Sequence, residues 1–293
     1  MATLQNRIDF VYIFDVKDGN PNGDPDAANS PRVDAEDMHG IVTDVCLKRK
    51  IRNYVLAKYY DEVNNKVTEG FDIFVKERAV LDTLVNNQYE YPSVKEKKAP
   101  EEKKAEAKKQ LCKNYYDIRT FGQVIATKEK TDQLRGPIQL TFARSVDEIM
   151  PRSFSITRMA VTTEAEAKNQ KGENRTMGRK ATVPYGLYLC HGFISANLAK
   201  QTGFDESDLE LFWEALKNMF DVDRSAARGL MSAQKLIVFK HDSELGNAPA
   251  NKLFDLVKVE RKDKTKPARS FNDYTVTIDK SSVPNGVEVI EML

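Results

Sequence analysis

The chain has 293 residues, enough to bury a sizeable core in one large domain or two smaller ones. Its 45 Lys and Arg residues and 44 Asp and Glu residues leave a formal net charge of +1, so any attraction to a polyanion must come from local patches. A hydrophobic fraction of 41% with a charged fraction of 30% is typical of a soluble globular protein and argues against a disordered or membrane-embedded chain.

The first predicted element is a strand over residues 7–16. Apolar side chains occupy both of its faces, a pattern that predicts a central strand. Residues 18–34 follow, and they are rich in Gly, Pro, Asn and Asp, which favour turns. We expect a long ordered loop there, and loops of that length are commonly functional.

A helix is predicted from about residue 37 to residue 60. Apolar residues between Leu47 and Val55 repeat at helical spacing and form one stripe. We expect a separate charged face on this helix, formed by Lys48, Arg49 and Arg52.

Two stretches interrupt the regular pattern. Residues 61–113 contain a Lys- and Glu-rich part, 95–113, which indicates an insertion with a solvated helix. After predicted strands at 117–127 and 137–142, residues 145–182 lack a clean period and carry many basic residues. This second stretch is interpreted as a projecting hairpin.

The remaining elements are predicted from shorter patterns. The expected order is a buried strand pair at 184–197, a helix at 205–220 and a strand at 236–239, followed by a basic run at 258–269. Without the two interruptions, the chain reads strand, helix, strands, helix, strand. This order predicts an α+β fold of the ferredoxin-like split βαβ type, which many RNA binders share.

Targeting and redox patterns favour a cytoplasmic protein. The apolar run 10–14 lies between Asp9 and Asp15, which is unlike a secretion signal, and the uncharged stretch 181–199 is broken by Pro and Gly residues, so no membrane span is expected. The three cysteines are far apart and suit reduced thiols.

Few residues have the spacing of a catalytic or cofactor site. The Cys and His residues form no zinc pattern, and no phosphate-binding loop, dinucleotide fingerprint or nucleophile motif is complete, so no cofactor is expected. The loop aspartates could in principle gather a divalent ion, but turn formation explains them more simply. They are Asp18, Asp24, Asp26, Asp34 and Asp37.

Scattered cationic residues remain on the first helix, in the 145–182 stretch and near residues 225–229. Such groups bind phosphates without reading base sequence. The aromatic stacking signature of a typical RRM domain is missing from the sequence. The pattern therefore favours a protein that holds the nucleic-acid backbone.

Four segments carry a resemblance to a known family. They are FDVKDGNPNGDPD (14–26), GPIQLTFARSVDEI with SITR (136–149 and 155–158), MGRKATVPYGLYLCHGFI (177–194) and DRSAARG (223–229). Together they resemble the guide-RNA-binding backbone subunit of type I-C CRISPR surveillance complexes (Cascade), in the RAMP superfamily.

The resemblance implies an RRM-like palm with finger and thumb insertions. The expected parts are the first part of the palm at 1–60, a finger-type insertion at 61–116, palm strands at 117–144, a thumb-type insertion at 145–182, the rest of the palm at 183–241 and a C-terminal extension at 242–293.

The family also implies partners. Many copies polymerise along the CRISPR guide RNA as a homo-oligomer, and the thumb of each copy displaces a base so that the segments between can pair with target DNA. A cap subunit, a large PAM-recognising subunit, a small subunit and a recruited helicase-nuclease complete the expected antiviral machinery.

The expected RNA-binding residues come from the matching motifs and from the first helix. Only the face geometry of that helix suggests its three basic residues as phosphate contacts. The full set is Asn20, Asn22, Gly23, Asp24, Lys48, Arg49, Arg52, Arg158, Arg179, Lys180, Ser225, Arg228 and Gly229.

The favoured function is a non-enzymatic, cytoplasmic RNA-binding scaffold. One alternative is a metal-dependent ribonuclease that resembles the type III backbone relatives, with Asp24 or Asp34 as its catalytic aspartate. Another is a lone RNA-binding regulator, which the missing base-reading motif disfavours.

Overall fold

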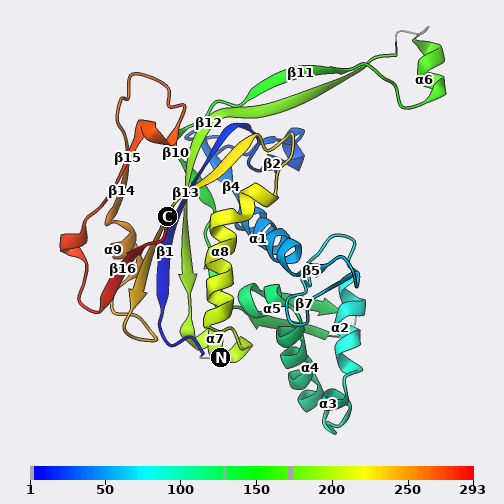
Figure 1. The fold of residues 1–293 in the computed structure, drawn as a ribbon, viewed down its shortest axis with the longest axis vertical. Coiled ribbons are helices and arrows are strands. Elements are labelled where there is room, and N and C mark those ends of the chain that lie inside the picture. Colours follow the sequence, from blue (N-terminus) through cyan, green and yellow to red (C-terminus); the bar gives the residue numbers. More distant parts are fainter. Residues whose placement is uncertain (1–2, 128–129, 171–173) are drawn as a thin grey trace.

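The computed structural model describes residues 3–127, 130–170 and 174–293. Within them, one antiparallel sheet of eight strands organises the molecule (Figure 1). Its main path runs through β16 (Val287–Glu291), β13 (Leu230–His241), β1 (Ile8–Gly19), β12 (Thr176–Ile194), β10 (Ala143–Glu148) and β4 (His39–Val42), while β9 (Ile138–Leu140) and β11 (Arg152–Arg158) also pair with β12.

Strand β1 is the centre of this sheet. It pairs with β12 from Ile8 opposite Ile194 to Gly19 opposite Val183, and with β13 on its other side. Residues 8–16 are all buried, because both faces of the strand are covered. The predicted central strand is therefore confirmed.

Two helices cover one face of the sheet. Helix α1 (Asp44–Tyr59) begins at Thr43, whose hydroxyl caps the amide of Cys46, and α8 (Glu206–Val222) begins with a capping box at Asp205. Both predicted helices are confirmed. The first begins later than predicted, because residues 39–42 pair with β10 as strand β4.

The C-terminal part of the chain covers the opposite face (Figure 1). Val11, Ile13 and Leu187 of the sheet pack there against Tyr274 and its neighbours. The covering elements are α9 (Ala250–Phe254), β14 (Val257–Arg261) and β15 (Tyr274–Ile278), with the short 3-10 helices η2 (Phe271–Asp273) and η3 (Lys280–Ser282).

Two predicted strands have a different structure. The segment predicted as a strand at 117–127 begins as helix α5 (Tyr116–Phe121), and Gly122, at φ 73°, then starts β7 (Gly122–Thr127), which pairs with β8 (Lys130–Arg135). The predicted strand pair at 184–197 is one long strand, β12, and Ser195 caps helix α7 (Ala196–Thr202) directly after it.

Residues 61–116 form a helical unit at one end of the molecule, away from the hairpin (Figure 1). Leu111 and Cys112 of its Lys-rich helix are buried against Phe74 and Val85, so this helix has an apolar side and is more than a solvated helix. The elements of this unit are β6 (Lys66–Val67), which pairs with β5 (Tyr60–Asp61), α2 (Leu81–Tyr89), α3 (Pro92–Lys95) and α4 (Pro100–Asn114).

At the other end, β11 and residues 176–182 of β12 leave the sheet as a long hairpin (Figure 1). Every residue of β11 is exposed. Near the tip lies helix α6 (Glu164–Asn169), which a capping box between Thr163 and Glu166 stabilises. Residues 152–182 are called the hairpin below.

The α+β class is confirmed. In the sheet, β13, β1, β12 and β10 lie side by side, with α1 after β1 and α8 between β12 and β13 in the chain. The more specific RRM-like designation stays a prediction. Within the described residues, no helix is long and apolar enough to cross a membrane.

Candidate nucleic-acid interface

The loop after β1 is fixed to the start of helix α1. The side-chain oxygen of Asn22 accepts hydrogen bonds from the amide and the hydroxyl of Thr43, at 2.9 and 3.0 Å. Asn20 donates from its side-chain amide to the carbonyl of Asn29 at 2.7 Å. Two of the predicted RNA-binding residues therefore shape the loop from within.

Gly23 and Asp24 complete this shape. A Cβ at Gly23 would overlap the side chain of Asn29, so only glycine fits the close approach. Gly23 and Asp24 form the short strand β2 (Gly23–Asp24), in which Asp24 pairs with Ser30 of β3 (Ser30–Pro31). Its carboxylate caps the amide of Asp26, at the start of η1 (Pro25–Ala27), and contacts Arg32 at 3.3 Å. The turn interpretation of this loop agrees with these contacts.

The turn formed by residues 225–229 interlocks with the end of β1. The amide of Asn20 donates to the carbonyl of Ala227 at 2.8 Å. A Cβ at Gly19 would overlap the carbonyl of Arg228, and a Cβ at Gly229, whose φ is 62°, would overlap the carbonyl of Lys17. The two backbone segments contact each other directly here, so no side chain fits and glycine is required at both positions.

Arg228 acts as a clamp in this contact. Its Nη1 lies 3.3 Å from the carbonyl oxygens of both Asn20 and Pro21, and its Nε lies 3.5 Å from a carboxylate oxygen of Asp223. Asp223 in turn accepts from the ammonium group of Lys50, a buried residue of α1. This chain of charges fixes the turn to both the loop and the helix.

The base of the hairpin reaches the same place. The ammonium group of Lys180 donates to the carbonyl of Ala226. The end of β1, its following loop, the 225–229 turn and the hairpin base therefore form one continuous region. We call residues 19–24, 225–229, Arg179 and Lys180 the loop–turn surface.

Several polar groups of the loop–turn surface face solvent. Ser225, Ala226 and Ala227 are exposed, and so is Arg179. In the register of the hairpin, Arg179 lies opposite Ser155, and its guanidinium makes no hydrogen bond or ion pair with any residue that the structure describes. An exposed, unpartnered guanidinium can bind a phosphate group.

Arg158 lies apart from the loop–turn surface. It pairs with Thr176, three residues farther along the hairpin than the pair Ser155–Arg179, or roughly 10 Å at the usual rise of a strand. Its guanidinium donates to the carbonyl of Ala160 and to the hydroxyl of Thr162, at 3.0 and 2.9 Å. Arg158 therefore lies farther out on the hairpin than Arg179.

The structure corrects the expectation of a charged face on helix α1, because its three basic side chains are not free. Lys48 pairs with Asp44 at 2.9 Å, Arg49 donates to the carbonyl of Val75 at 2.7 Å, and buried Arg52 pairs with Asp117, also at 2.7 Å. The reason is that residues 72–76 and α5 pack against this side of the helix. These segments lie far from α1 in the sequence, so the helical pattern of α1 could not predict this contact.

The loop aspartates do not assemble as a metal site among the described residues, where no group of three or more His, Cys, Asp or Glu side chains could hold an ion. Asp34 instead pairs with Arg144 at 2.9 Å. The backbone amide of Glu36 and the guanidinium of Arg144 lower the pKa of Asp34. Asp24 and Asp34 are each tied to a different arginine.

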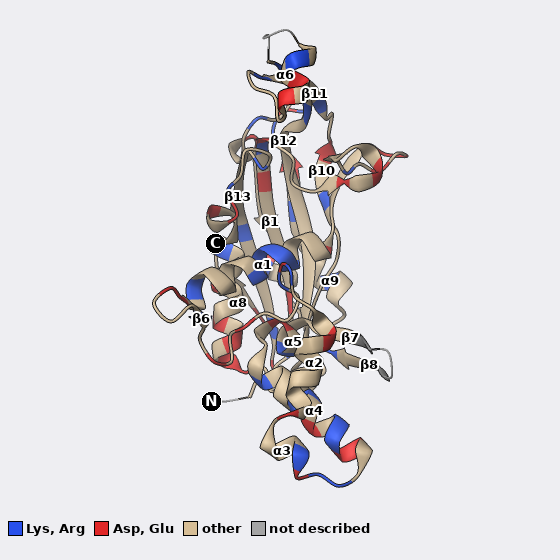
Figure 2. Ribbon diagram, turned by 90° about the vertical axis from the view of Figure 1, so that its right-hand side faces the viewer, with Lys and Arg blue, Asp and Glu red and all other residues tan. Residues whose placement is uncertain are grey.

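Charge is spread over the molecule rather than gathered on one face. Figure 2 shows Lys and Arg positions on the hairpin, α1 and α4, interspersed with acidic ones. Sequence reasoning missed the ion pair behind Arg228, between buried Lys50 and partly exposed Asp223. The signal available in the sequence was the position of Lys50 among apolar residues of the helix, directly before Ile51 of the core stripe.

Comparison with known proteins shows what kind of chain carries this interface. The family model described as CRISPR-associated protein Cas7 matches residues 6–279, nearly the whole chain. The chain belongs to the Cas7 family. A curated relative, the CRISPR-associated protein Cas7 of Haloferax volcanii, is 25% identical over 309 residues, which cover 95% of this chain and 82% of the relative.

Solved structures similar to this Cas7-family chain come from CRISPR complexes. A chain of a pre-nicking CRISPR RNA-guided surveillance complex is 15% identical, with a TM-score of 0.47 over 80% of this chain and 75% of that one. A chain of a type III-B Cmr-beta complex bound to cognate target RNA is 11% identical, with a TM-score of 0.42 over 80% and 61%.

The expected family is thus confirmed at the level of Cas7. The type I-C assignment stays a prediction.

Proposed function

We propose that this chain is a non-catalytic scaffold that polymerises along CRISPR guide RNA, holds its backbone and exposes its bases for pairing with target DNA. The loop–turn surface carries the proposal: Lys180 joins an exposed turn to the base of a projecting hairpin, and the guanidinium of the next residue, Arg179, is exposed and has no partner within the described residues. Membership of the Cas7 family supports it, because the family consists of CRISPR-associated proteins.

The proposed contacts follow from the geometry. Arg179 and Lys180 bind phosphate oxygens, while Ser225 and the exposed amides of its turn donate to the sugar-phosphate backbone. Arg228, Gly229 and the loop residues Asn20, Asn22, Gly23 and Asp24 hold the shape of this surface. Arg158 contacts RNA farther out on the hairpin.

Lys48, Arg49 and Arg52 stand outside the proposed interface, because their donors already bond to acceptors within the chain. Separating buried Arg52 from its carboxylate would cost more free energy than an exposed phosphate contact would contribute. The remaining cations are enough for sequence-independent binding.

In the proposed assembly, this chain forms the palm, finger and thumb of each repeated unit in a cytoplasmic type I-C Cascade. A cap subunit, a large subunit and a small subunit complete the complex, and a recruited helicase-nuclease cuts the DNA. Sequence recognition then lies in base pairing, and the protein holds the shape of the guide.

Binding to two guide-length RNAs of unrelated sequence tests the scaffold. We expect equal affinity for the two RNAs and cooperative binding. We expect Arg179→Ala to make the fall of log affinity with log salt less steep by about 0.7, the value for one single-strand phosphate contact. Lys97→Ala, which removes an exposed charge from the 61–116 unit, is the matched control. A protein that stays monomeric and does not bind either RNA at low salt contradicts the proposal.

The non-catalytic part has a separate test. Guide-loaded complex is incubated with matching target RNA and Mg²⁺, and intact RNA is the expected result. Regularly spaced cuts that disappear in Asp24→Ala or Asp34→Ala would show a ribonuclease instead.

A further inference from the structure

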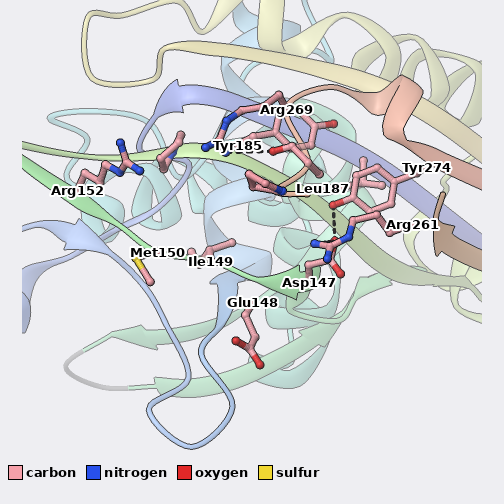
Figure 3. A pocket seen from close by; sticks show the side chains of 14 residues that line it. Asp147, Glu148, Ile149, Met150, Arg152, Tyr185, Leu187, Arg261, Arg269 and Tyr274 are labelled. Carbon is pink, nitrogen blue, oxygen red and sulfur yellow. Dashed lines mark hydrogen bonds and ion pairs between the residues drawn. The ribbon is translucent and has the colours of Figure 1, made fainter. Parts of the chain in front are cut away.

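A cavity of about 270 Å³ lies at the base of the hairpin, on the sheet face that the C-terminal part covers (Figure 3). Its lining comes from three parts of the chain. Arg152 begins the hairpin, Tyr185 and Leu187 belong to β12, and Arg261 and Arg269 belong to the C-terminal part. None of these residues is in the loop–turn surface.

Two of the arginines face each other across this cavity. The side chains of Arg152 and Arg269 point toward one another in Figure 3. Both residues are exposed. Within the described parts of the chain, the guanidinium of Arg152 makes no hydrogen bond or ion pair, and the guanidinium of Arg269 reaches only the carbonyl of Ala268, at 3.1 Å.

The nearby acidic groups do not neutralise this pair. Asp147 accepts the hydroxyl of Tyr274 at 2.6 Å and lies 3.5 Å from the guanidinium of Arg261, so its charge is already matched. Glu148 also lines the cavity, but its carboxylate points away from the arginines (Figure 3). Tyr185 donates its hydroxyl to Asp15 at 3.0 Å.

We propose that this cavity is an oxyanion site that binds a phosphate group between Arg152 and Arg269. Two like charges that face each other without a carboxylate between them are stabilised by an anion, and two guanidinium groups offer the forked donors that fit phosphate oxygens. The apolar side chains of Ile149 and Leu187 below them leave room for the sugar or base of a nucleotide.

Binding there has a structural consequence. Arg152 is the first residue of β11, and Arg269 lies between β14 and β15. A phosphate held by both would connect the base of the hairpin to the C-terminal part and restrict the direction of the hairpin. The phosphate group comes either from a free nucleotide or from a nucleic-acid strand.

Calorimetric titration of the full-length, RNA-free chain with inorganic phosphate, at constant ionic strength in chloride, tests the site. We expect the double variant R152Q/R269Q to bind phosphate at least about tenfold more weakly, because it loses two charge-assisted contacts. The control K264Q/K266Q removes two exposed charges from the same part of the chain outside the cavity, and its affinity should match that of the wild type. Equal phosphate affinity in the wild type and R152Q/R269Q would overturn the proposal, as would no binding at all.

Two further titrations distinguish the sources of the phosphate. If AMP binds more tightly than a short single-stranded oligonucleotide, and only the wild type and the control bind it, the site takes a free nucleotide. The opposite order, with an oligonucleotide affinity that falls in R152Q/R269Q but not in K264Q/K266Q, indicates a nucleic-acid strand. Arg179→Ala should leave the affinities for inorganic phosphate and AMP unchanged, so failure of the RNA-scaffold proposal would remain distinguishable from failure of this one.

Discussion

The ammonium group of Lys50 is buried on helix α1, with 2% of its side chain exposed. Its acceptor is Asp223, which also contacts the Arg228 clamp at 3.5 Å. A buried charge is tolerated when it is paired, and removal of its partner is strongly destabilising. The loop–turn surface therefore depends on a residue that no RNA can reach.

Asp223→Ala tests this dependence. We expect a loss of about 3 kcal/mol in the free energy of unfolding, near the low end for a broken buried pair because the Asp223 side chain is 20% exposed. Urea denaturation measures the loss. Asp221→Ala, which removes a 68% exposed carboxylate two residues away, should change the free energy of unfolding little. Equal effects of the two substitutions would show that the Lys50 pair contributes no special stability.

Asp15 gives a pH-dependent prediction. Burial raises the pKa of its carboxyl above the ordinary 3.8, against the opposing hydrogen bonds from Gln234 and Tyr185. The folded state therefore favours the protonated form. The resulting stability is complete below the unfolded pKa, and it is lost as pH rises through the raised folded pKa.

Asp15→Asn removes this titration but keeps an oxygen that can accept from Tyr185. We expect the variant to unfold at a higher urea concentration than the wild type at neutral pH, and we expect the difference to shrink toward pH 3.8. Asp26→Asn, at an exposed site, serves as the control. A difference that does not change with pH would contradict the assigned cause.

The sequence motifs indicated the residues of the loop–turn surface as expected RNA contacts, but they did not predict that the loop and the turn meet. The motif 223–229 and the loop 20–24 do meet, through the contacts of Arg228. The pairing of Arg52 with Asp117 joins residues 65 positions apart, and no local period reports such a contact. Helical periodicity shows on which face of the helix a side chain lies, but it does not show which other part of the chain packs against that face.

At the scale of elements, the hairpin is separate from the hydrophobic core. Core residues of β12 begin at Val183, and no residue of the hairpin between 153 and 181 belongs to a core cluster among the described residues. Its strands are held by their own ladder from Arg152–Thr182 to Arg158–Thr176. The sheet therefore does not depend on the hairpin for its stability.

Replacement of residues 153–181 by Asn-Gly between the paired residues Arg152 and Thr182 tests this independence. We expect cooperative thermal unfolding with a midpoint close to that of the wild type, because the replaced part buries no core residue and Asn-Gly favours a tight hairpin turn. Circular dichroism measures the midpoint. A broad or absent transition would show that the hairpin contributes to the core.

Regular patterns predicted β1, α1 and α8 well, because each has one dominant apolar face or two fully buried ones. Helix α5 was missed because all six of its residues are buried, so neither a strand nor a helix period stands out. In β12, the Pro and Gly residues that suggested a break lie inside one 19-residue strand whose partners change along its length.

At the scale of the whole molecule, the two excursions project from opposite ends of the sheet (Figure 1). The hairpin base adjoins the loop–turn surface. At the far end, Arg119 of α5 donates to the carbonyls of Gly70 and Cys112 in the 61–116 unit and pairs with Asp208 of α8 at 2.8 Å, which ties that unit to the sheet-covering helix. In the proposed assembly, such a chain contacts neighbours on two sides while the loop–turn surface binds the RNA. With a formal net charge of +1, repeated copies would repel one another little.

The proposed binding of repeated copies of the chain along RNA predicts the stoichiometry of the complex. If each copy covers a fixed length of the backbone, doubling the RNA length should double the number of bound chains, whatever the base sequence. Mass measurement of complexes by analytical ultracentrifugation, on two RNAs of unrelated sequence at each length, determines this number. The variant without hairpin residues 153–181 is the informative comparison, because its sheet and loop–turn backbone remain while Arg179 and Lys180 are lost. We expect that variant to bind fewer copies, less cooperatively. A single bound chain at every RNA length would mean that the protein recognises one site and does not form a filament.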